Sequence, residues 1–275
     1  MKKNAYLYRL RTWLRHHLTA WNTGGEGVHS PYLFEWVRMV MSDKHAYRIW
    51  NDIERVRAQM LASKEVVEFV DYGSGKRLLG KNARNERLVR EIAKGSLAKA
   101  KYAQMLFRLV NWLGHQLRKD DEALTIVELG TSLGVTTAYM AGVDARDKVY
   151  TYEGCEAVAK IARNNWETLG INNIECRIGA INGKILKDCL ERVDIAFVDA
   201  NHTYVASLEY FNVLADKVHE KSVIVMDDIY HSEEMEKVWE EICKDERVTT
   251  TIDLYQMGLV FFDKHYWKRN YRMRL

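Results

Sequence analysis

The sequence predicts an α/β fold, in which a mostly parallel sheet of seven strands lies between two layers of helices. Three observations predict it. Short apolar runs alternate with helix-like segments after residue 121, most of these runs end in an acid or a glycine, and a very short connection joins the last two runs. Alternation of this kind is typical of βαβ units. A short connection between two strands requires them to be antiparallel.

The N-terminal part of the chain is expected to be helical. Apolar residues there are spaced three and four apart, as on one face of a helix. Helices are therefore expected over residues 3–20, 31–37, 45–63 and 97–117. The second of these begins with Ser30 followed by Pro31, because serine caps a helix and proline suits its first position.

The remaining chain supplies the sheet. Five apolar runs are typical of buried strands, at residues 125–129, 148–152, 173–178, 193–198 and 222–226. Two more, 248–255 and 259–262, are expected to form a C-terminal antiparallel hairpin. We therefore expect a helical extension (residues 1–120), a sheet domain (121–263) and a basic tail (264–275).

Composition excludes several classes of protein. The 275 residues are 47% hydrophobic and 29% charged, which is ordinary for a globular protein and too apolar for a disordered one. No run approaches the ~18 apolar residues of a membrane span. Five basic residues interrupt residues 1–20, so no secretory signal is expected there. Four cysteines without a CxxC pair favour a reduced, cytoplasmic compartment.

Basic residues gather at the two ends of the chain. Residues 1–20 and 264–275 each hold five Lys or Arg, which leaves 31 basic residues against 38 acidic ones in between. Such tails can bind nucleic acid or an anionic membrane. Alternatively, they are solvated helix faces or close as a clasp on the acidic body of the same chain.

Acids stand where the predicted strands end. Glu128, Glu153, Asp199 and the pair Asp227–Asp228 follow four different apolar runs. The carboxyl ends of parallel strands are where open α/β sheets bind ligands. The alternative is that each acid caps the following helix, which the helix dipole favours. Because four strands share the feature, we expect a polar ligand at this edge.

The loop from Glu128 to Gly134 reads ELGTSLG, with glycines spaced GxxxG. Its glycines let the backbone approach a ligand while a helix N-terminus points at it. Glu153 stands 23 residues after Gly130, where a carboxylate can accept both hydroxyls of a ribose. The ribose carboxylate fits a nicotinamide or an S-adenosylmethionine site. The ExGxxxG pattern together with the terminal hairpin favours the latter.

Residues 97–263 resemble the class I S-adenosylmethionine-dependent methyltransferases, which have a Rossmann-like three-layer fold. The segment YAQML (102–106) leading to VELGTSLGVTTAYMA is similar to the small-molecule O-methyltransferases of the catechol and caffeoyl-CoA type. The segment GVHSPY (27–32) resembles an uncharacterised bacterial branch. The resemblance implies a cofactor site formed by strand ends and the loops after them: Glu128, Gly130, Thr131, Ser132, Gly134, Glu153, Gly154, Ala180, Ile181 and Asp199.

The segment FVDANHTY implies the chemical end of the site. In cation-dependent relatives the strand-end Asp binds a metal ion and a Lys three residues later acts as base; here these positions hold Asp199 and His202. The family's later Asp-Asn pair is Asp227–Asp228. Three carboxylates suit Mg²⁺ or another oxygen-preferring divalent cation. His202 can take a proton near neutral pH, with or without a metal, or can be a structural loop histidine.

We therefore expect a methyltransferase acting on a hydroxyl of a small molecule. The helical extension is expected to form a lid on the acceptor, a homodimer surface, or both. Two alternatives stay open: an RNA or protein methyltransferase that docks through the basic tails, and a non-catalytic cofactor-binding protein. A second glycine-rich segment, DYGSG (71–75), is expected to be a turn because no strand ending in an acid follows it.

Overall fold

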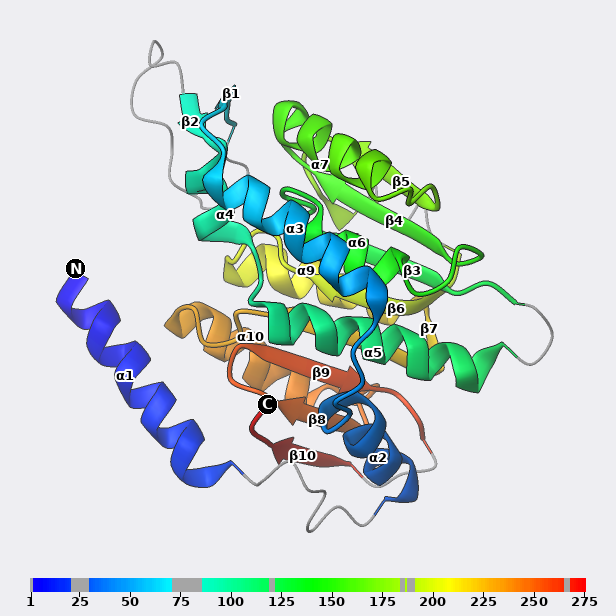
Figure 1. Ribbon diagram of the computed structural model, residues 1–275. Helices are drawn as coiled ribbons and strands as arrows, with labels where there is room; N and C mark the ends of the chain where they lie inside the picture. The colour runs from blue at the N-terminus through cyan, green and yellow to red at the C-terminus, as the bar shows by residue number, and fades with distance from the viewer. Residues whose placement is uncertain are drawn as a thin grey trace. The chain divides into compact units, whose positions relative to one another are not determined.

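The computed structural model describes residues 2–20, 30–70, 86–118, 122–183, 186, 191–264 and 268–275. The GVHSPY segment lies only partly within these ranges, and DYGSG lies outside them. The chain divides into two compact units. Figure 1 labels its helices and strands. We call Met1–Asp43 with Asn182–Leu275 the terminal unit, and Lys44–Ile181 the central unit.

The central unit holds three parallel strands and the helices around them. The strands are β3 (Thr125–Leu129), β4 (Lys148–Glu153) and β5 (Ile174–Ile178), and β4 pairs with both of the others. The helices are α3 (Arg48–Ala62), α4 (Val89–Ser96), α5 (Ala100–Leu117), α6 (Val135–Ala141) and α7 (Glu156–Thr168). A separate two-stranded sheet joins β1 (Val66–Glu68) to β2 (Glu86–Leu88).

The terminal unit holds five strands of the main sheet. Strands β6 (Val193–Val198) and β7 (Val218–Asp227) are parallel, and β9 (Met257–Phe261) is antiparallel to both β7 and β8 (Thr250–Asp253). The remaining strand is β10 (Arg269–Arg272), parallel to β8. The helices are α1 (Lys2–Thr19), α2 (Pro31–Trp36), the π-helical η1 (Val37–Met41), α9 (Tyr204–Ala215) and α10 (Glu233–Lys244).

The α/β class, the mostly parallel sheet and its C-terminal antiparallel hairpin are confirmed. The main sheet has one strand more than predicted, because residues 269–272 of the expected basic tail pair with β8 as β10. Three basic residues within five positions hid this strand from a hydrophobic-pattern analysis. The cap of α2 is as predicted: the Ser30 side chain accepts a hydrogen bond from Leu33 N at 3.3 Å.

The two compact units cut across the boundary expected at residue 120. The central unit contains α3 to α5 together with the first three parallel strands, and the terminal unit contains the first helix together with the last strands. A role of residues 1–120 as a lid or dimer surface stays a prediction. No helix in the described ranges is long and apolar enough to cross a membrane.

Helix α1 docks on the C-terminal part of its own unit through polar side chains. Tyr8 donates its hydroxyl proton to Glu236 Oε2 at 2.8 Å, and His16 Nε2 lies 3.3 Å from Asp253 Oδ1. From the other end of the chain, Arg272 donates to Asp253 Oδ2 at 2.9 Å and to Thr19 Oγ1 at 2.7 Å. The described parts of the two basic ends thus close as an intramolecular clasp, one of the alternatives raised above.

Asp253 is the centre of this clasp. Its carboxylate is 4% exposed and also accepts hydrogen bonds from the Tyr230 hydroxyl at 2.7 Å and from Tyr255 N at 2.9 Å. Burial by itself would raise the pKa of Asp253, but the hydrogen bonds from His16 and Tyr230 bring it below the ordinary value. The ionised form is therefore the one that the folded protein stabilises.

We expect Asp253→Asn to lower the free energy of unfolding at pH 7 by about 3 kcal/mol, because it removes the buried carboxylate that accepts hydrogen bonds from Tyr230, Tyr255 and the half-buried Arg272. A depressed carboxyl pKa contributes stability above the unfolded value of 3.8 and loses it as pH falls through the folded value. The difference between wild type and variant should therefore shrink below about pH 4. Urea unfolding at pH 7 and pH 3 measures it.

The matched control is Asp216→Asn, since Asp216 also pairs with an arginine but has a 60% exposed side chain. That change should cost less than about 1 kcal/mol. Equal losses for the two variants would show that the clasp is only a surface contact.

Candidate functional site

The turn after β3 has a backbone that few residues can adopt. Gly130, Ser132 and Gly134 all have positive φ angles, of 98°, 48° and 74°. Left-handed conformations of this kind favour glycine, and a serine there is uncommon. Gly134 then serves as the N-cap of α6. The sequence ELGTSLG therefore folds into a tight turn that leads directly into a helix.

Hydrogen bonds to β4 and from α7 hold this turn in place. Gly130 N and Thr131 N both donate to Tyr152 O of β4, at 3.0 and 3.1 Å. From α7, Trp166 Nε1 donates to Gly134 O at 2.7 Å and Asn165 Nδ2 donates to Leu133 O at 2.9 Å. The carbonyl groups at the end of the turn are thus engaged on the α7 side.

The carboxylate of Glu153 also bonds to this turn. Its Oε2 accepts a hydrogen bond from Ser132 N at 2.8 Å, and its Oε1 accepts one from Cys155 N at 2.9 Å. Burial raises the pKa of Glu153, partly offset by these backbone donors. A carboxylate has about four lone-pair sites, so Glu153 can bond to the backbone at Ser132, Cys155 and Gly154 and still accept a hydrogen bond from a ligand hydroxyl.

Glu128 lies beneath the turn. It is completely buried, and its Oε2 accepts hydrogen bonds from the hydroxyls of Thr137 at 2.5 Å and Thr151 at 2.6 Å. Thr151 in turn contacts the Thr131 hydroxyl at 2.6 Å. Of the acids expected to contact the cofactor, Glu128 is therefore placed to support the turn, whereas Glu153 stands at its open edge.

The third strand end lies next to Glu153. Glu153 pairs with Ile178 in the β4–β5 register, and Gly179 N donates to Glu153 O at 2.9 Å. Ala180 is exposed, while Gly154 and Ile181 are half-buried. Every expected cofactor residue from 128 to 181 thus belongs to the central unit and gathers at the carboxyl ends of β3, β4 and β5.

Further contacts, made by Ser96 and by Cys155, were not expected from the sequence. The hydroxyl of Ser96 in α4 lies 2.6 Å from that of Ser132. Cys155 Sγ contacts Val70 N and Glu68 O, each at 3.5 Å, beside the small sheet of β1 and β2. Ser96 and Ser132 are 36 residues apart, and no local pattern indicates a contact of that separation.

The expected chemical residues belong to the terminal unit. Asp199 follows β6, Asp227 ends β7, and Asp228 comes next with a φ of 52°. His202 Nε2 lies 3.4 Å from Asp199 Oδ1, and the His202 ring stacks on that of His231 at 5.3 Å between centroids. The structure therefore brings Asp199 and His202 together as expected, and adds His231.

Asp228 is fully engaged by its own neighbours. Its Oδ1 accepts a hydrogen bond from Gln256 Nε2 at 2.6 Å, and its Oδ2 lies 3.3 Å from His231 Nδ1. Burial would raise the pKa of Asp228, but the hydrogen bond from His231 and the nearby basic groups His202, His231 and Arg9 bring it below the ordinary value. Asp228 is the ionised member of the cluster.

The pKa values of the two neighbouring aspartates are raised, and the pKa of His202 is lowered. Burial, with the charge of Asp228, raises the pKa of Asp199 to about 7. Burial, with the charges of Asp199 and Asp228, also raises the pKa of Asp227, whose Oδ1 is buried without a hydrogen-bond partner. Burial lowers the pKa of His202, and the proximity of His231 adds to the effect. His202 is therefore neutral near pH 7 and able to accept a proton.

These carboxylates do not form the donor set expected for a divalent cation. Within the described ranges, no group of three or more His, Cys, Asp or Glu side chains is arranged to hold a metal ion. Each oxygen of Asp228 already has one partner, Gln256 or His231, so a cation would have to use the remaining lone pairs. The metal site predicted from Asp199, Asp227 and Asp228 is thus not formed in this arrangement.

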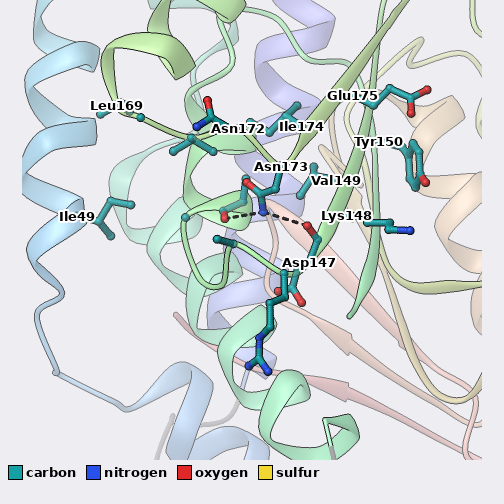
Figure 2. A pocket seen from close by; sticks show the side chains of 16 residues that line it. Ile49, Asp147, Lys148, Val149, Tyr150, Leu169, Asn172, Asn173, Ile174 and Glu175 are labelled. Atoms are coloured by element: carbon teal, nitrogen blue, oxygen red, sulfur yellow. Dashed lines mark hydrogen bonds between the residues drawn. The ribbon is translucent and has the colours of Figure 1, made fainter. Parts of the chain in front are cut away.

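A cavity of about 770 Å³ lies elsewhere in the central unit (Figure 2). Lys148 and Ile174, where β4 and β5 begin, line it, so it opens at the amino ends of these strands, away from Glu153. Asn173 there donates to the carbonyl groups of Ala141, Asp144 and Asp147 at 3.1–3.2 Å. The side-chain amide of Asn173 is thus bonded to the backbone. The cavity is not part of the candidate site.

Comparison with known proteins supports the resemblance drawn from the sequence. Residues 127–229 match a family model described as a methyltransferase domain. This range begins in β3 and ends just after Asp228, and so includes most of both groups of candidate residues. A search among curated proteins finds no significant match.

Solved structures share the fold at low sequence identity. A Bacillus cereus O-methyltransferase solved with S-adenosylhomocysteine has a TM-score of 0.53 and 18% identity, with 82% of this chain and 95% of that one covered. A Podospora anserina methyltransferase bound to S-adenosylhomocysteine has a TM-score of 0.56 and 12% identity, with 85% and 96% covered. TomG of Streptomyces achromogenes, an O-methyltransferase of tomaymycin synthesis solved with S-adenosylmethionine, has a TM-score of 0.50 and 18% identity, with 61% and 82% covered.

The turn generates a stability prediction. A Cβ added at Gly134 would lie 2.6 Å from Trp166 Nε1 and 2.8 Å from Ala162 Cβ. Gly170 has a similar φ of +68° with nothing within 4 Å of an added Cβ, so Gly170→Ala isolates the backbone cost. We expect Gly134→Ala to lower the free energy of unfolding by about 1–3 kcal/mol more than Gly170→Ala. Urea unfolding of both variants measures the difference, and equal losses would contradict a tightly supported turn.

At these strand ends the chain has a glycine turn closed by one carboxylate, and its residues 127–229 match the methyltransferase model; the enzyme class expected from the sequence, an S-adenosylmethionine-dependent methyltransferase, is confirmed.

Proposed function

We propose that this chain transfers the methyl group of S-adenosylmethionine to a hydroxyl group of a small molecule. The observation that carries the proposal is the geometry of Glu153, which is fixed by two backbone amides at the open edge of the glycine turn. The O-methyltransferases among the structural neighbours support an oxygen acceptor.

The central unit has the groups that such a cofactor requires. Glu153 accepts hydrogen bonds from the backbone at Ser132, Cys155 and Gly154, and the remaining lone-pair capacity of its carboxylate would accept a ribose hydroxyl. The turn from Gly130 to Gly134 would receive the amino-acid end, and Ala180 and Ile181 would border the adenine. When bound, the sulfonium supplies an electrophilic methyl group. The chain then has to hold the acceptor oxygen in line with that methyl group and remove its proton.

His202 is the base in this proposal. If the acceptor oxygen formed a bond to the methyl carbon, the bond from that carbon to sulfur would break and the hydroxyl proton would pass to a base; the neutral imidazole of His202 can accept such a proton. The Asp199 carboxyl group, 3.4 Å from Nε2, would orient the ring and stabilise its protonated form. His231, stacked on His202 and bonded to the ionised Asp228, would hold the ring from the other side.

A divalent cation has no step in this scheme. The reason is the arrangement of the donors, because the described residues form no group of three His, Cys, Asp or Glu side chains placed to hold a metal ion. Methyl transfer measured with and without a chelator tests the point. Strict dependence on Mg²⁺ would mean that Asp199, Asp227 and Asp228 rearrange to bind it.

Glu153→Ala should weaken S-adenosylmethionine binding about 100-fold, because it removes the acceptor for the ribose and loosens the turn at Ser132. Isothermal titration calorimetry measures the affinity. Glu156→Ala, in the exposed first turn of α7, is the matched control and should bind as the wild type does. Unchanged affinity in the Glu153 variant would refute the assignment of the cofactor site.

His202→Gln should lower kcat roughly 100-fold or more while cofactor affinity stays unchanged. Formation of S-adenosylhomocysteine with a panel of catechols and phenols measures turnover, and calorimetry measures affinity. His115→Gln, an exposed position on α5, serves as control. Full activity in the His202 variant would remove the base from the mechanism. Cofactor binding without turnover on any acceptor would favour the non-catalytic alternative.

A further inference from the structure

Helix α1 carries its most apolar face outward. Four leucines, Leu7, Leu10, Leu14 and Leu18, are 41–83% exposed. Tyr6 and Trp13 extend the same face, with 69% and 42% of their surface exposed. We call these six side chains the leucine stripe. A helix that only packed on its own domain would turn such residues inward, so the stripe needs another explanation.

The docking of α1 explains how the stripe stays exposed. Tyr8, Thr12 and His16 are spaced four apart and lie on one face, where each contacts the C-terminal part of the unit. With 3.6 residues per turn, the leucines of the stripe fall on the opposite face. The polar clasp therefore fixes α1 in an orientation that presents the stripe to the surroundings.

Positive charge flanks the stripe. Arg9 and Arg11 are exposed and lie at its two edges by helical spacing. Residues 1–20 contain five basic residues and no acid. The other end of the chain adds exposed basic residues: Arg274 donates to His17 O, and Lys268 and Arg269 lie at and beside β10. The acids that α1 contacts, Glu236 and Asp253, lie on its docked side.

We infer that the leucine stripe is a docking surface for an anionic lipid membrane, on which α1 lies in the plane of the headgroups. An apolar face with tryptophan and leucine, bordered by basic residues, is the pattern of helices that bind such an interface. A second copy of the chain fits less well, since stripe-to-stripe contact would bring like charges together. A nucleic acid would contact the arginines through its phosphates, but it would leave the leucines exposed to water.

The test uses the full-length protein with vesicles of phosphatidylglycerol and phosphatidylcholine, compared with vesicles of phosphatidylcholine alone. Co-sedimentation is expected with the anionic vesicles and should weaken as salt rises. The double change Leu10→Glu, Leu14→Glu should lower the fraction bound roughly tenfold or more, because two apolar side chains no longer enter the interface. Arg11→Glu should weaken binding and reduce its salt dependence.

Val205→Glu is the matched control, because Val205 is 74% exposed on α9 of the same unit and lies outside the stripe. It should bind vesicles as the wild type does. Circular dichroism and thermal unfolding report whether each variant folds. Leu18→Ser replaces the double change if that one does not fold, since Leu18 is 83% exposed and makes few contacts to lose.

Three outcomes would overturn the inference. The first is no binding to anionic vesicles at low salt, and the second is equal binding by wild type and the stripe variants. The third is a different occupant: a dimer in sedimentation equilibrium that the leucine changes dissolve, or RNA binding in a mobility-shift assay with no vesicle binding. None of these outcomes bears on Glu153 or His202, so the proposed methyl transfer is tested separately.

Discussion

A carboxylate buried in a protein needs hydrogen-bond donors or a positive partner, and this requirement organises both units. Asp253 meets it with His16, Tyr230 and Arg272, and so fixes the first helix to the last strand. Glu128 meets it with two threonine hydroxyls, and Glu153 with two backbone amides. Each of these acids holds in place segments that are distant in sequence, because unpaired burial of the charge would cost several kcal/mol.

The acids at the ends of β6 and β7 contrast with the others. Among the described residues, Asp227 has a buried oxygen with no hydrogen-bond partner, and Asp199 has a long contact of 3.4 Å to His202. Both have raised pKa values, whereas Asp228 beside them is stabilised in its ionised form. Neighbouring groups whose pKa values are pushed apart are typical of sites that move protons. Glu153, by comparison, is fixed by backbone donors and suits binding.

Much of this fold could be predicted from periodicity alone. The strands at 125–129, 148–153 and 193–198, and the helices at 2–19 and 31–36, lie within a residue or so of their predicted bounds. Their signals are local, since each apolar run or helical face appears in a short window of sequence. The acids at the strand ends are equally local, which is why Glu153 and Asp199 could be located in advance.

What could not be predicted depends on contacts between distant residues. Glu128 and Glu153 both stand at the end of an apolar run. Only the fold shows that Glu128 is buried beneath the turn, where it bonds to two threonines that are nine and 23 residues away. Strand β10 has too many charges to resemble a strand, and it forms because β8 offers an edge. The composition of α1 suggests a helix packed through its leucines, but its polar contacts reverse that orientation.

The clasp has a consequence for the order in which the chain matures. His16 precedes its partner Asp253 by 237 positions, and Thr19 precedes Arg272 by 253 positions, so the ribosome releases α1 long before the residues that anchor it. Domains fold as they emerge during synthesis. The central unit has all its own residues by Ile181, so it can assemble while α1 still lacks every one of these anchoring partners. During that interval the leucines of α1 have no fixed orientation, and a nascent-chain chaperone has its best opportunity to bind them.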